Sequence, residues 1–433
     1  MKKALLLFLT CTAAYLLKAQ PEITTIAAGL NAPIGIELDA DGNLWVAESG
    51  TGQTDGSVSI IRPDGSVEKF VEGLPSAMSS EGEVSGPERV QSLGDGMVAV
   101  LVGPTPDTLE RTILIFAVED YAPGAPLSRE DARSVIYVGK TVLKTLPDSN
   151  PYSLVFDGCD MYIADAGANA IVRRIGLTGE LRIFAQFPPI ANPLPFGPPF
   201  SDAVPTRIVK NPDGGFYVSQ LTGFPFVTGA SRIWSVDEAG TVEPYDTNYS
   251  LVTDLAISPE DGGLLALQFA SFDISQTPPF LFNSAMITHT HPDGSRDTLV
   301  TGFGPSAGMA VTDDGVIYVT SLFFGTVLKI DNLTGIWDPN APGKSGAVNA
   351  WPNPAHDTVN LGFELEKSTA LEAEIYDIQG RLLARRSFGQ LASGPNTVEL
   401  ELKGIANNQA YQQLVLVRLK GDGVDLQQKV LVR

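Results

Sequence analysis

Residues 32–48 read APIGIELDADGNLWVAE. This stretch holds two short apolar runs on either side of an Asp-Gly turn at Asp39–Asn43. Two further runs, at 57–61 and 66–70, are divided by the turn Arg62-Pro63-Asp64-Gly65. Short runs of alternating or β-branched residues separated by Asp-Gly turns are typical of antiparallel hairpins. The unit therefore predicts a four-stranded antiparallel meander.

The same unit recurs along the chain. Clear copies begin at Pro151 and Pro205, and weaker copies begin at Pro87, Thr253 and Ser306. The spacing of the leading prolines at 33, 87, 151 and 205 suits one four-stranded blade for each copy. Six copies, with almost no helical periodicity between them, predict an all-β fold with a six-bladed β-propeller over residues 20–335.

The sixth copy lacks a fourth strand after Ile330, and the N-terminal segment offers one. Residues 22–30 resemble the fourth strand of the first copy at 66–74, including the closing Gly-Leu pair. We therefore expect Ile23–Ala28 to pair with residues 326–330. This pairing completes the last blade and closes the ring.

Residues 1–19 have the order of a secretory signal peptide. Lys2 and Lys3 precede an apolar run that ends at Leu17, and Ala19 offers a small residue for cleavage. No other run of about 18 apolar residues follows, so we expect no transmembrane segment. Cys159 is the only cysteine after processing, so the exported chain relies on a large core rather than on disulfides.

The formal net charge of the chain is −21. A strongly acidic surface repels nucleic acid and anionic lipid, and the sequence contains no basic run that would offset this repulsion. We therefore expect no nucleic-acid partner.

The composition changes after the sixth copy. Residues 336–346 form a turn-rich linker, and residues 347–433 form a separate all-β module that is too short for another blade. Three motifs follow in order: Trp351-Pro352-Asn353-Pro354-Ala355, Ile375-Tyr376-Asp377-Ile378-Gln379-Gly380-Arg381, and Lys429-Val430-Leu431-Val432-Arg433. Together they resemble the type A C-terminal sorting domain of the type IX secretion system.

This resemblance implies a small C-terminal β-sandwich that is read by the outer-membrane export machinery and is often removed when the cargo is attached to the cell. It places the protein outside the cell or on the outer-membrane surface of a Gram-negative cell. The export machinery is thus the partner expected for residues 347–433.

The propeller region resembles the ScyD/ScyE family. The matching stretches are Asn150-Pro151-Tyr152, residues 164–170 with the sequence ADAGANA, and residues 217–226 with the sequence YVSQLTGFPF. The resemblance spans nearly all of residues 22–335 and implies the propeller fold. It supplies no catalytic role for any residue.

Polar side chains recur where the copies place the mouth of the central channel. The candidates are Glu48, Glu88, Arg89, Asp165, Arg207, Gln220, Asp254 and Gln268. The carboxylates of Glu48, Asp165 and Asp254 could bind Ca²⁺ or Mg²⁺, because these ions prefer oxygen ligands. In the alternative interpretation the polar groups pair with one another, for example Arg89 or Arg207 with Glu48 or Asp254.

Histidine is scarce. His289 and His291 fall at the hairpin between the third and fourth strands of blade five, on the face opposite the channel mouth, and His356 lies in the C-terminal module. The channel mouth therefore lacks the histidine that a Ser-His-Asp triad or a histidine-ligated zinc site requires.

An apolar loop rich in proline and phenylalanine leads into blade four. Phe196 and Phe200 belong to this loop, and blade order places them beside Phe224 and Phe226, which follow the second strand of the same blade. Proline stiffens such loops, so the rings could be held open for a ligand at little entropic cost. Alternatively, the rings pack on one another as a lid.

Two functions follow from these features. The favoured hypothesis is a binding or scaffold protein at the cell surface, whose partner is an apolar or aromatic small molecule or a surface protein and which requires no cofactor. The alternative is a lyase or lactonase that depends on Ca²⁺ or Mg²⁺ at the channel mouth.

Overall fold

A computed structural model describes residues 21–79, 82–331, 348–351, 355, 358–365, 367–376, 382–403, 413–421 and 424–432. The chain divides into two compact units, Met1–Trp337 and Asp338–Arg433, each with its own hydrophobic core. The predicted signal peptide at 1–19 and the predicted linker at 336–346 lie outside the described residues.

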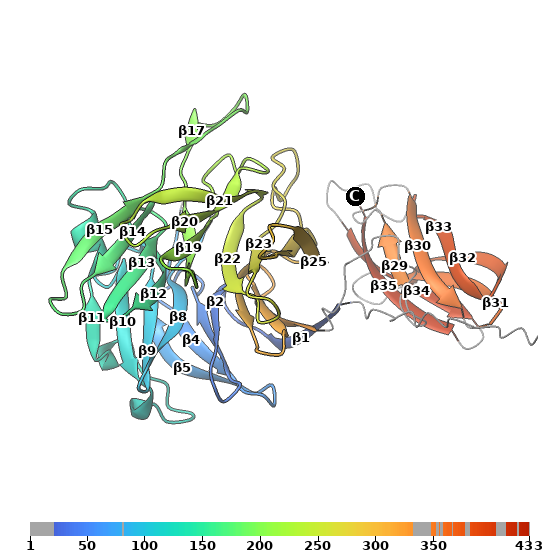
Figure 1. Ribbon diagram of the computed structural model, residues 1–433. Coiled ribbons are helices and arrows are strands. Elements are labelled where there is room, and N and C mark those ends of the chain that lie inside the picture. The colour runs from blue at the N-terminus through green and yellow to red at the C-terminus, as the bar shows by residue number, and fades with distance from the viewer. Residues whose placement is uncertain are drawn as a thin grey trace, which may run out of the picture. The chain divides into compact units, whose positions relative to one another are not determined.

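Six four-stranded antiparallel sheets form the first unit, which confirms the six-bladed propeller (Figure 1). Blade one contains β2 (Pro33–Leu38), β3 (Leu44–Glu48), β4 (Gly56–Ile61) and β5 (Val67–Leu74). Blade two contains β8 (Pro87–Gly94), β9 (Met97–Val102), β10 (Thr112–Ala117) and β11 (Ser134–Ile136). Blade three contains β12 (Pro151–Asp157), β13 (Asp160–Asp165), β14 (Ala170–Arg174) and β15 (Leu181–Gln186).

The remaining blades follow the same order of strands. Blade four contains β18 (Pro205–Lys210), β19 (Phe216–Gln220), β20 (Ser231–Val236) and β21 (Val242–Tyr249). Blade five contains β22 (Val252–Ile257), β23 (Leu264–Gln268), β24 (Ala285–Thr290) and β25 (Arg296–Phe303). Blade six contains β26 (Ser306–Val311), β27 (Ile317–Ser321), β28 (Thr326–Asp331) and β1 (Glu22–Ala28). The first strands of neighbouring blades pack against one another around the central channel.

The ring closes as the sequence predicts. Strand β1 pairs antiparallel with β28, from Glu22 opposite Asp331 to Ala28 opposite Thr326. Ala27 is buried in a core cluster that also contains Ile36 of blade one. The first and last parts of the propeller are therefore joined in a single sheet.

The Asp-Gly turns fold for a local reason that blade one illustrates. The Oδ1 atom of Asp39 accepts hydrogen bonds from the backbone N–H groups of Asp41 at 2.9 Å and Asn43 at 2.8 Å. Its Oδ2 atom accepts one from the Nε1 atom of Trp45 at 2.9 Å. Gly42 has a φ angle of 80°, which favours glycine. The repeated aspartate thus builds the hairpin turn.

Six core clusters lie between neighbouring blades, one at each boundary around the ring. Between blades one and two, for example, Trp45 and Phe70 pack with Val98 and Phe116. Each blade is therefore apolar on both sheet faces and is held by its two neighbours, as expected for a propeller.

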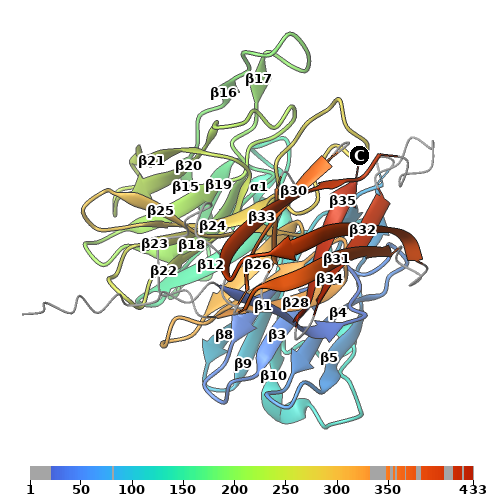
Figure 2. The same cartoon turned by 90° about the vertical axis from the view of Figure 1, so that its right-hand side faces the viewer.

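Short elements decorate this ring. They are the strand pair β6 (Ala77–Met78) and β7 (Val84–Ser85), the strand pair β16 (Ile190–Ala191) and β17 (Phe200–Ser201), the 3₁₀ helices Val118–Asp120 and Arg129–Asp131, and α1 (Val138–Val142). The β16–β17 hairpin projects beyond the blades in both ribbon views (Figures 1 and 2). No helix among the described residues is long and apolar enough to cross a membrane.

The second unit is a small β-sandwich, as predicted. One sheet contains β29 (Val348–Trp351), β30 (Thr358–Leu365) and β33 (Gly394–Glu401). The other contains β32 (Leu382–Leu391), β31 (Thr369–Tyr376), β34 (Gln413–Gly421) and β35 (Val424–Val432). Buried residues of both sheets, including Leu361, Phe363, Ile375 and Val417, share one core.

Candidate functional site

Three charged side chains meet inside the channel. Arg89 of β8 places its Nη1 atom 2.9 Å from the Oδ2 atom of Asp254 of β22, and both side chains are completely buried. Arg207 of β18 places its Nε atom 3.5 Å from the Oδ1 atom of the same carboxylate. In the channel, these arginine and aspartate side chains therefore pair with one another, which is the alternative to cation binding that the sequence analysis raises.

Asp254 has a complete set of partners. Its oxygens also accept hydrogen bonds from the backbone N–H groups of Leu255 at 2.8 Å and Met309 at 2.9 Å. The two guanidinium groups are less well satisfied, because two nitrogens of Arg89 and two of Arg207 are buried without a hydrogen-bond partner. Burial lowers the pKa of Arg207, and the charge of Arg89 lowers it further.

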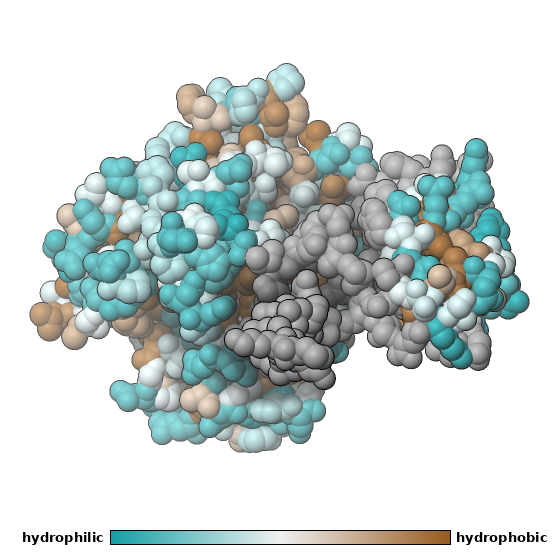
Figure 3. Space-filling model, turned by 45° about the vertical axis from the view of Figure 1, so that its right-hand side comes forward, coloured by the Kyte–Doolittle hydropathy of each residue, from teal (hydrophilic) through white to brown (hydrophobic). Residues whose placement is uncertain are grey.

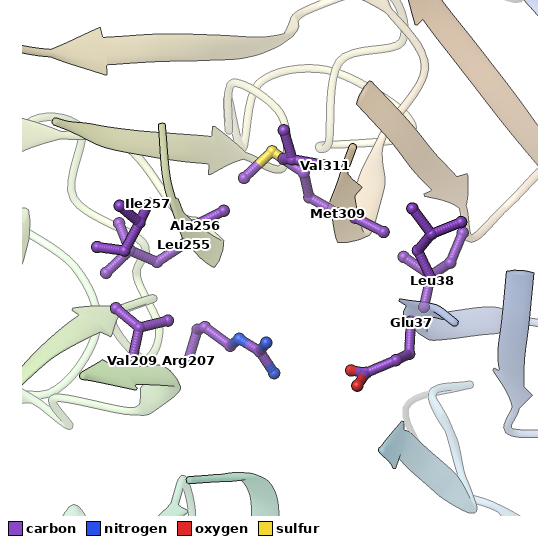
Figure 4. Close-up of a pocket in the computed structure, with 11 residues that line it drawn as sticks. Glu37, Leu38, Arg207, Val209, Leu255, Ala256, Ile257, Met309 and Val311 are labelled. Carbon is purple, nitrogen blue, oxygen red and sulfur yellow. The ribbon is translucent and has the colours of Figure 1, made fainter. Parts of the chain in front are cut away.

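A cavity of about 250 Å³ lies on one side of these charges. Its lining includes Glu37, Arg207, Leu255, Ile257 and Met309. Figure 4 shows the side chains of Arg207 and Glu37 pointing toward one another across it. Burial raises the pKa of Glu37, although the charges of Arg207 and Arg89 oppose this shift.

Four of the predicted channel-mouth residues occupy equivalent positions at the ends of second strands. In the antiparallel register each lies opposite the residue that starts the first strand of its blade: Glu48 opposite Pro33, Asp165 opposite Pro151, Gln220 opposite Pro205, and Gln268 opposite Val252. All four are buried. The sequence alignment of the copies therefore placed them correctly.

The partners of Glu48 lie within its own blade and the loop that leads into it. Its Oε2 atom accepts a hydrogen bond from the backbone N–H of Asn31 at 2.7 Å. Its Oε1 atom accepts hydrogen bonds from the Ser59 hydroxyl and the Lys69 ammonium group, each at 2.5 Å. Glu48 thus fixes the loop that precedes the first strand.

Blades three and five use the same device. Asp165 accepts hydrogen bonds from the backbone N–H of Asn150 at 2.5 Å and from a second backbone N–H, that of Ala168, at 3.1 Å. Gln268 accepts one from the backbone N–H of Ser250 at 2.8 Å. Asp165 and Gln268 therefore hold the loops that precede the first strands of their blades. Gln220 of blade four differs, because it accepts a hydrogen bond from the Nε1 atom of Trp234 in β20 at 2.7 Å.

The three carboxylates predicted to share a cation are not brought together as one ligand set. Among the described residues, the ligand atoms of Glu48, Asp165 and Asp254 do not form a group within 4.8 Å of one another. Each carboxylate instead has the separate partners described above. Burial raises the pKa of Asp165, and the hydrogen bonds from Ser149 and Asn150 oppose this shift.

Glu88 lies in a different polar pocket. A Cβ atom placed on Gly103 would lie 2.5 Å from the Oε1 atom of Glu88, 2.8 Å from the Ser85 hydroxyl and 3.0 Å from the Asn150 amide oxygen. The Asn150 amide oxygen is buried without a hydrogen-bond partner. Burial raises the pKa of Glu88 to about 8, against the lowering effect of Arg89.

Phenylalanine rings form a continuous series on the face of the propeller that carries the loops between the second and third strands of the blades. We call this the phenylalanine cluster, and its members are Phe196, Phe224, Phe226, Phe269, Phe272, Phe280, Phe282, Phe323 and Phe324. Ring centroids are 6.3 Å apart for Phe196 and Phe224, 6.1 Å for Phe224 and Phe226, and 5.0 Å for Phe226 and Phe272. The series extends over blades four, five and six.

Part of this cluster is open to solvent. Phe224 is 45% exposed, and Phe323 and Phe324 are each 53% exposed. Figure 3 shows apolar residues gathered around the projecting hairpin at the top of the propeller. Phe200 is also exposed, but its ring contacts no other aromatic ring among the described residues. Three of the four predicted rim residues, Phe196, Phe224 and Phe226, therefore belong to the phenylalanine cluster, and Phe200 does not.

Hydrogen bonds hold the loops beneath the rings. The Nδ2 atom of Asn192 donates to the carbonyl oxygens of Phe196 at 2.7 Å and Pro198 at 2.8 Å. The Ser201 hydroxyl donates to the carbonyl oxygen of Phe224 at 3.0 Å. The loop that enters blade four is thereby attached to the loop that follows β19.

The second unit matches a known family. The profile of the secretion system C-terminal sorting domain matches residues 349–407. The C-terminal unit is thus similar to the C-terminal sorting domains of a secretion system. The sorting domain indicates export of the chain to the cell surface, as in Bacteroidetes that use this secretion system, and implies contact with the export machinery.

Several solved structures are similar to the chain at low identity. The PQQ-bound aldose sugar dehydrogenase of Streptomyces coelicolor is 14% identical, with a TM-score of 0.49 over 72% of this chain and 98% of that one. The apo-form soluble aldose sugar dehydrogenase of Escherichia coli is 12% identical, with a TM-score of 0.48 over 72% and 100%. PorZ, a surface component of the type IX secretion system of Porphyromonas gingivalis, is 12% identical, with a TM-score of 0.34 over 92% and 59%.

At these identities and TM-scores, nothing about the chemistry of the site follows from the solved structures. No curated protein sequence matches the chain.

Proposed function

We propose that this protein is a binding protein of the cell surface, whose phenylalanine cluster binds an apolar or aromatic ligand. The observation that supports the proposal most directly is the partial exposure of Phe224, Phe323 and Phe324 within one continuous series of rings. Contiguous exposed apolar surface on a soluble protein marks a site of interaction. The rest of this chain is strongly acidic, with a net charge of −21.

The loops support the proposal because they are held in place before any ligand arrives. The hydrogen bonds of Asn192 and Ser201 fix the backbone beside Phe196 and Phe224. A ligand that stacks on rings already in position loses less free energy to ordering than one that must arrange them. The resemblance of the propeller to the ScyD/ScyE family is compatible with this function but names no ligand.

The channel gives little support to the alternative of a lyase or lactonase that uses Ca²⁺ or Mg²⁺. Arg89 and Arg207 share the carboxylate of Asp254 and place two positive charges where the cation would have to bind. The oxygens of Glu48 and Asp165 accept hydrogen bonds from backbone and side-chain donors.

In this proposal, residues 347–433 direct the propeller to the cell surface, where it binds its ligand.

Binding of Nile red, an uncharged dye that reports apolar surfaces, tests the proposal. The Phe224→Ala variant should bind the dye with a dissociation constant about 5-fold to 140-fold higher than that of the wild type, which corresponds to about 1–3 kcal/mol for an anchoring ring. Leu177→Ala is the matched control, because Leu177 is 94% exposed and lies outside the cluster. Equal dye affinity of the Phe224→Ala variant and the wild type would contradict the proposal.

A further inference from the structure

Two hairpins of blade five bring the side chains of Asp261, His289 and His291 together. These hairpins lie at the end of the blade opposite the phenylalanine cluster. Asp261 lies in the turn between β22 and β23, while His289 and His291 lie at the end of β24 and in the turn that leads into β25. These turns connect first to second and third to fourth strands. They therefore occupy the end of the blade opposite the loop that carries Phe269 and Phe280.

The carboxylate of Asp261 lies between the two imidazoles. Its Oδ1 atom is 2.9 Å from the Nε2 atom of His289, and its Oδ2 atom is 2.7 Å from the Nδ1 atom of His291. One ligand atom from each residue lies within 4.8 Å of the others. Among the described residues, this is the group of histidine, cysteine, aspartate or glutamate side chains that is close enough to hold one metal ion.

The second nitrogen of His291 is also occupied. Its Nε2 atom lies 3.1 Å from the Oδ2 atom of Asp297. A neutral imidazole has one N–H group, so it can donate to only one of the two carboxylates. If that proton faces Asp297, the lone pair of Nδ1 points to the side where Asp261 and His289 converge. An imidazole whose other nitrogen donates to a carboxylate is the usual arrangement of a metal-bound histidine.

Gly263 leaves space beside this convergence point. A Cβ atom at this position would lie 2.8 Å from the Nε2 atom of His289 and 3.0 Å from the Oδ1 atom of Asp261. It would also lie 2.4 Å from the carbonyl oxygen of Thr290, so the close approach of the hairpins requires glycine as well. The backbone N–H of Gly263 donates to Oδ1 of Asp261 at 2.8 Å and fixes the orientation of the carboxylate.

We propose that Asp261, His289 and His291 form a binding site for a divalent transition metal ion, with Asp297 orienting His291. Two imidazoles and one carboxylate suit Zn²⁺, whereas Ca²⁺ and Mg²⁺ favour sets made of oxygen alone. Ligand atoms around tetrahedral Zn²⁺ lie roughly 3.3 Å apart, so small side-chain shifts from the present distances accommodate the ion.

Bound Zn²⁺ would join the two hairpins of blade five. The His289 side chain is almost fully buried, while the Asp261 and His291 side chains are partly exposed, so water could complete the coordination of the ion. The only described cysteine, Cys159, is free, so a metal ion would supply a cross-link that no disulfide among the described residues provides. Such a site stabilises the folded chain by a free energy that rises with the logarithm of the free ion concentration once that concentration exceeds the dissociation constant.

Equilibrium dialysis of the full chain without a histidine tag, against ZnCl₂ alone, tests the site. The wild type should retain one Zn²⁺ per chain and should gain thermal stability on addition of Zn²⁺ and lose it on addition of a chelator. His291→Ala should abolish both effects. His356→Ala changes the third histidine of the chain and should leave both effects intact.

The Asp297→Asn variant tests whether Asp297 positions His291 for metal binding or only supports the fold. It should weaken Zn²⁺ binding about 10-fold to 100-fold without abolishing it, because Asp297 acts through His291. Loss of one bound Zn²⁺ in His291→Ala, with retention in His356→Ala, supports the site even if His289→Ala fails to fold. Absence of stoichiometric Zn²⁺ in the wild type, or equal binding by His291→Ala, would overturn it.

Discussion

The guanidinium group of Arg89 lies 2.9 Å from the carboxylate of Asp254, and both side chains are completely buried in the channel. Arg207 approaches the other oxygen of the same carboxylate at 3.5 Å. Two positively charged side chains therefore share the carboxylate of Asp254. At this level the channel contains charged side chains, and those of Arg89 and Asp254 are completely buried.

Replacement of Asp254 should be strongly destabilising. The Asp254→Asn variant removes the carboxylate nearest to the Arg89 and Arg207 guanidinium groups, which should lower the free energy of unfolding by about 3–5 kcal/mol. Urea denaturation of the variant and the wild type measures the difference. Glu180→Gln breaks an exposed pair with Arg182 and should have little effect. If both variants unfold like the wild type, the buried charges contribute no net stabilisation.

The Glu88 carboxyl group predicts a pH-dependent stability. Burial raises the pKa of this group from 4.5 to about 8. Because the pKa is higher in the folded state, Glu88 favours the folded state most when its carboxyl group is protonated. Its contribution to the free energy of unfolding is therefore fully present below about pH 4.5 and is lost as the pH rises toward about 8. Thermal unfolding of the wild type should therefore shift to lower temperature across this range.

The Glu88→Gln variant provides the comparison. Glutamine has a similar shape and no titrating proton, so the part of the pH dependence that comes from Glu88 should disappear. The variant should lose less stability between about pH 5 and about pH 8 than the wild type does. Identical pH profiles for the two proteins would show that Glu88 does not titrate in this range.

The closing strand predicts a large difference between two neighbouring alanines. Ala27 is buried against Ile36 and Val327, whereas Ala28, the next residue of β1, is exposed. Ala27→Asp would bury an unpaired carboxylate and should lower the free energy of unfolding by about 3 kcal/mol or more. Ala28→Asp is the matched control and should change it by less than about 1 kcal/mol. Similar losses in both variants would argue that β1 adds little to the ring.

The sorting domain predicts the fate of a truncated protein. Deletion of residues 347–433 should leave a folded propeller, because the described part of the first unit has its own ring of core clusters. The truncated chain should accumulate in the periplasm, whereas the full chain reaches the cell surface. Protease accessibility on intact cells, with thermal unfolding as the control for folding, distinguishes the two locations. Surface exposure of the truncated chain would contradict the export role.

The fold could be predicted because its determinants are local. Asp39 and its equivalents form turns through hydrogen bonds to residues two to six positions away, so the pattern is legible in the sequence. The closing strand could be predicted for a different reason. Residues 22–30 resemble the fourth strand of blade one, and the sixth copy of the repeat has no fourth strand of its own.

The site was less predictable because its contacts are distant in sequence. The copies placed Glu48 at the correct strand end, but its partners Asn31 and Lys69 come from a loop and from an outer strand. His291 was placed at the correct hairpin, yet its contact with Asp261 depends on how two hairpins of one blade approach each other. Strand patterns give positions along a blade and do not give the directions of side chains at its ends.

The phenylalanine cluster leads to the last prediction, which separates a binding surface from a self-packed lid. Phe226 lies in the interior of the cluster, with ring centroids 5.0 Å from Phe272 and 5.4 Å from Phe280, while Phe224 is 45% exposed. Phe226→Ala removes packing and should lower the free energy of unfolding by about 2 kcal/mol or more. Phe224→Ala should instead weaken Nile red binding and change the unfolding temperature little. Calorimetry with and without the dye measures both effects. If Phe224→Ala loses as much stability as Phe226→Ala and its dye affinity is unchanged, the rings form a lid and the binding proposal fails.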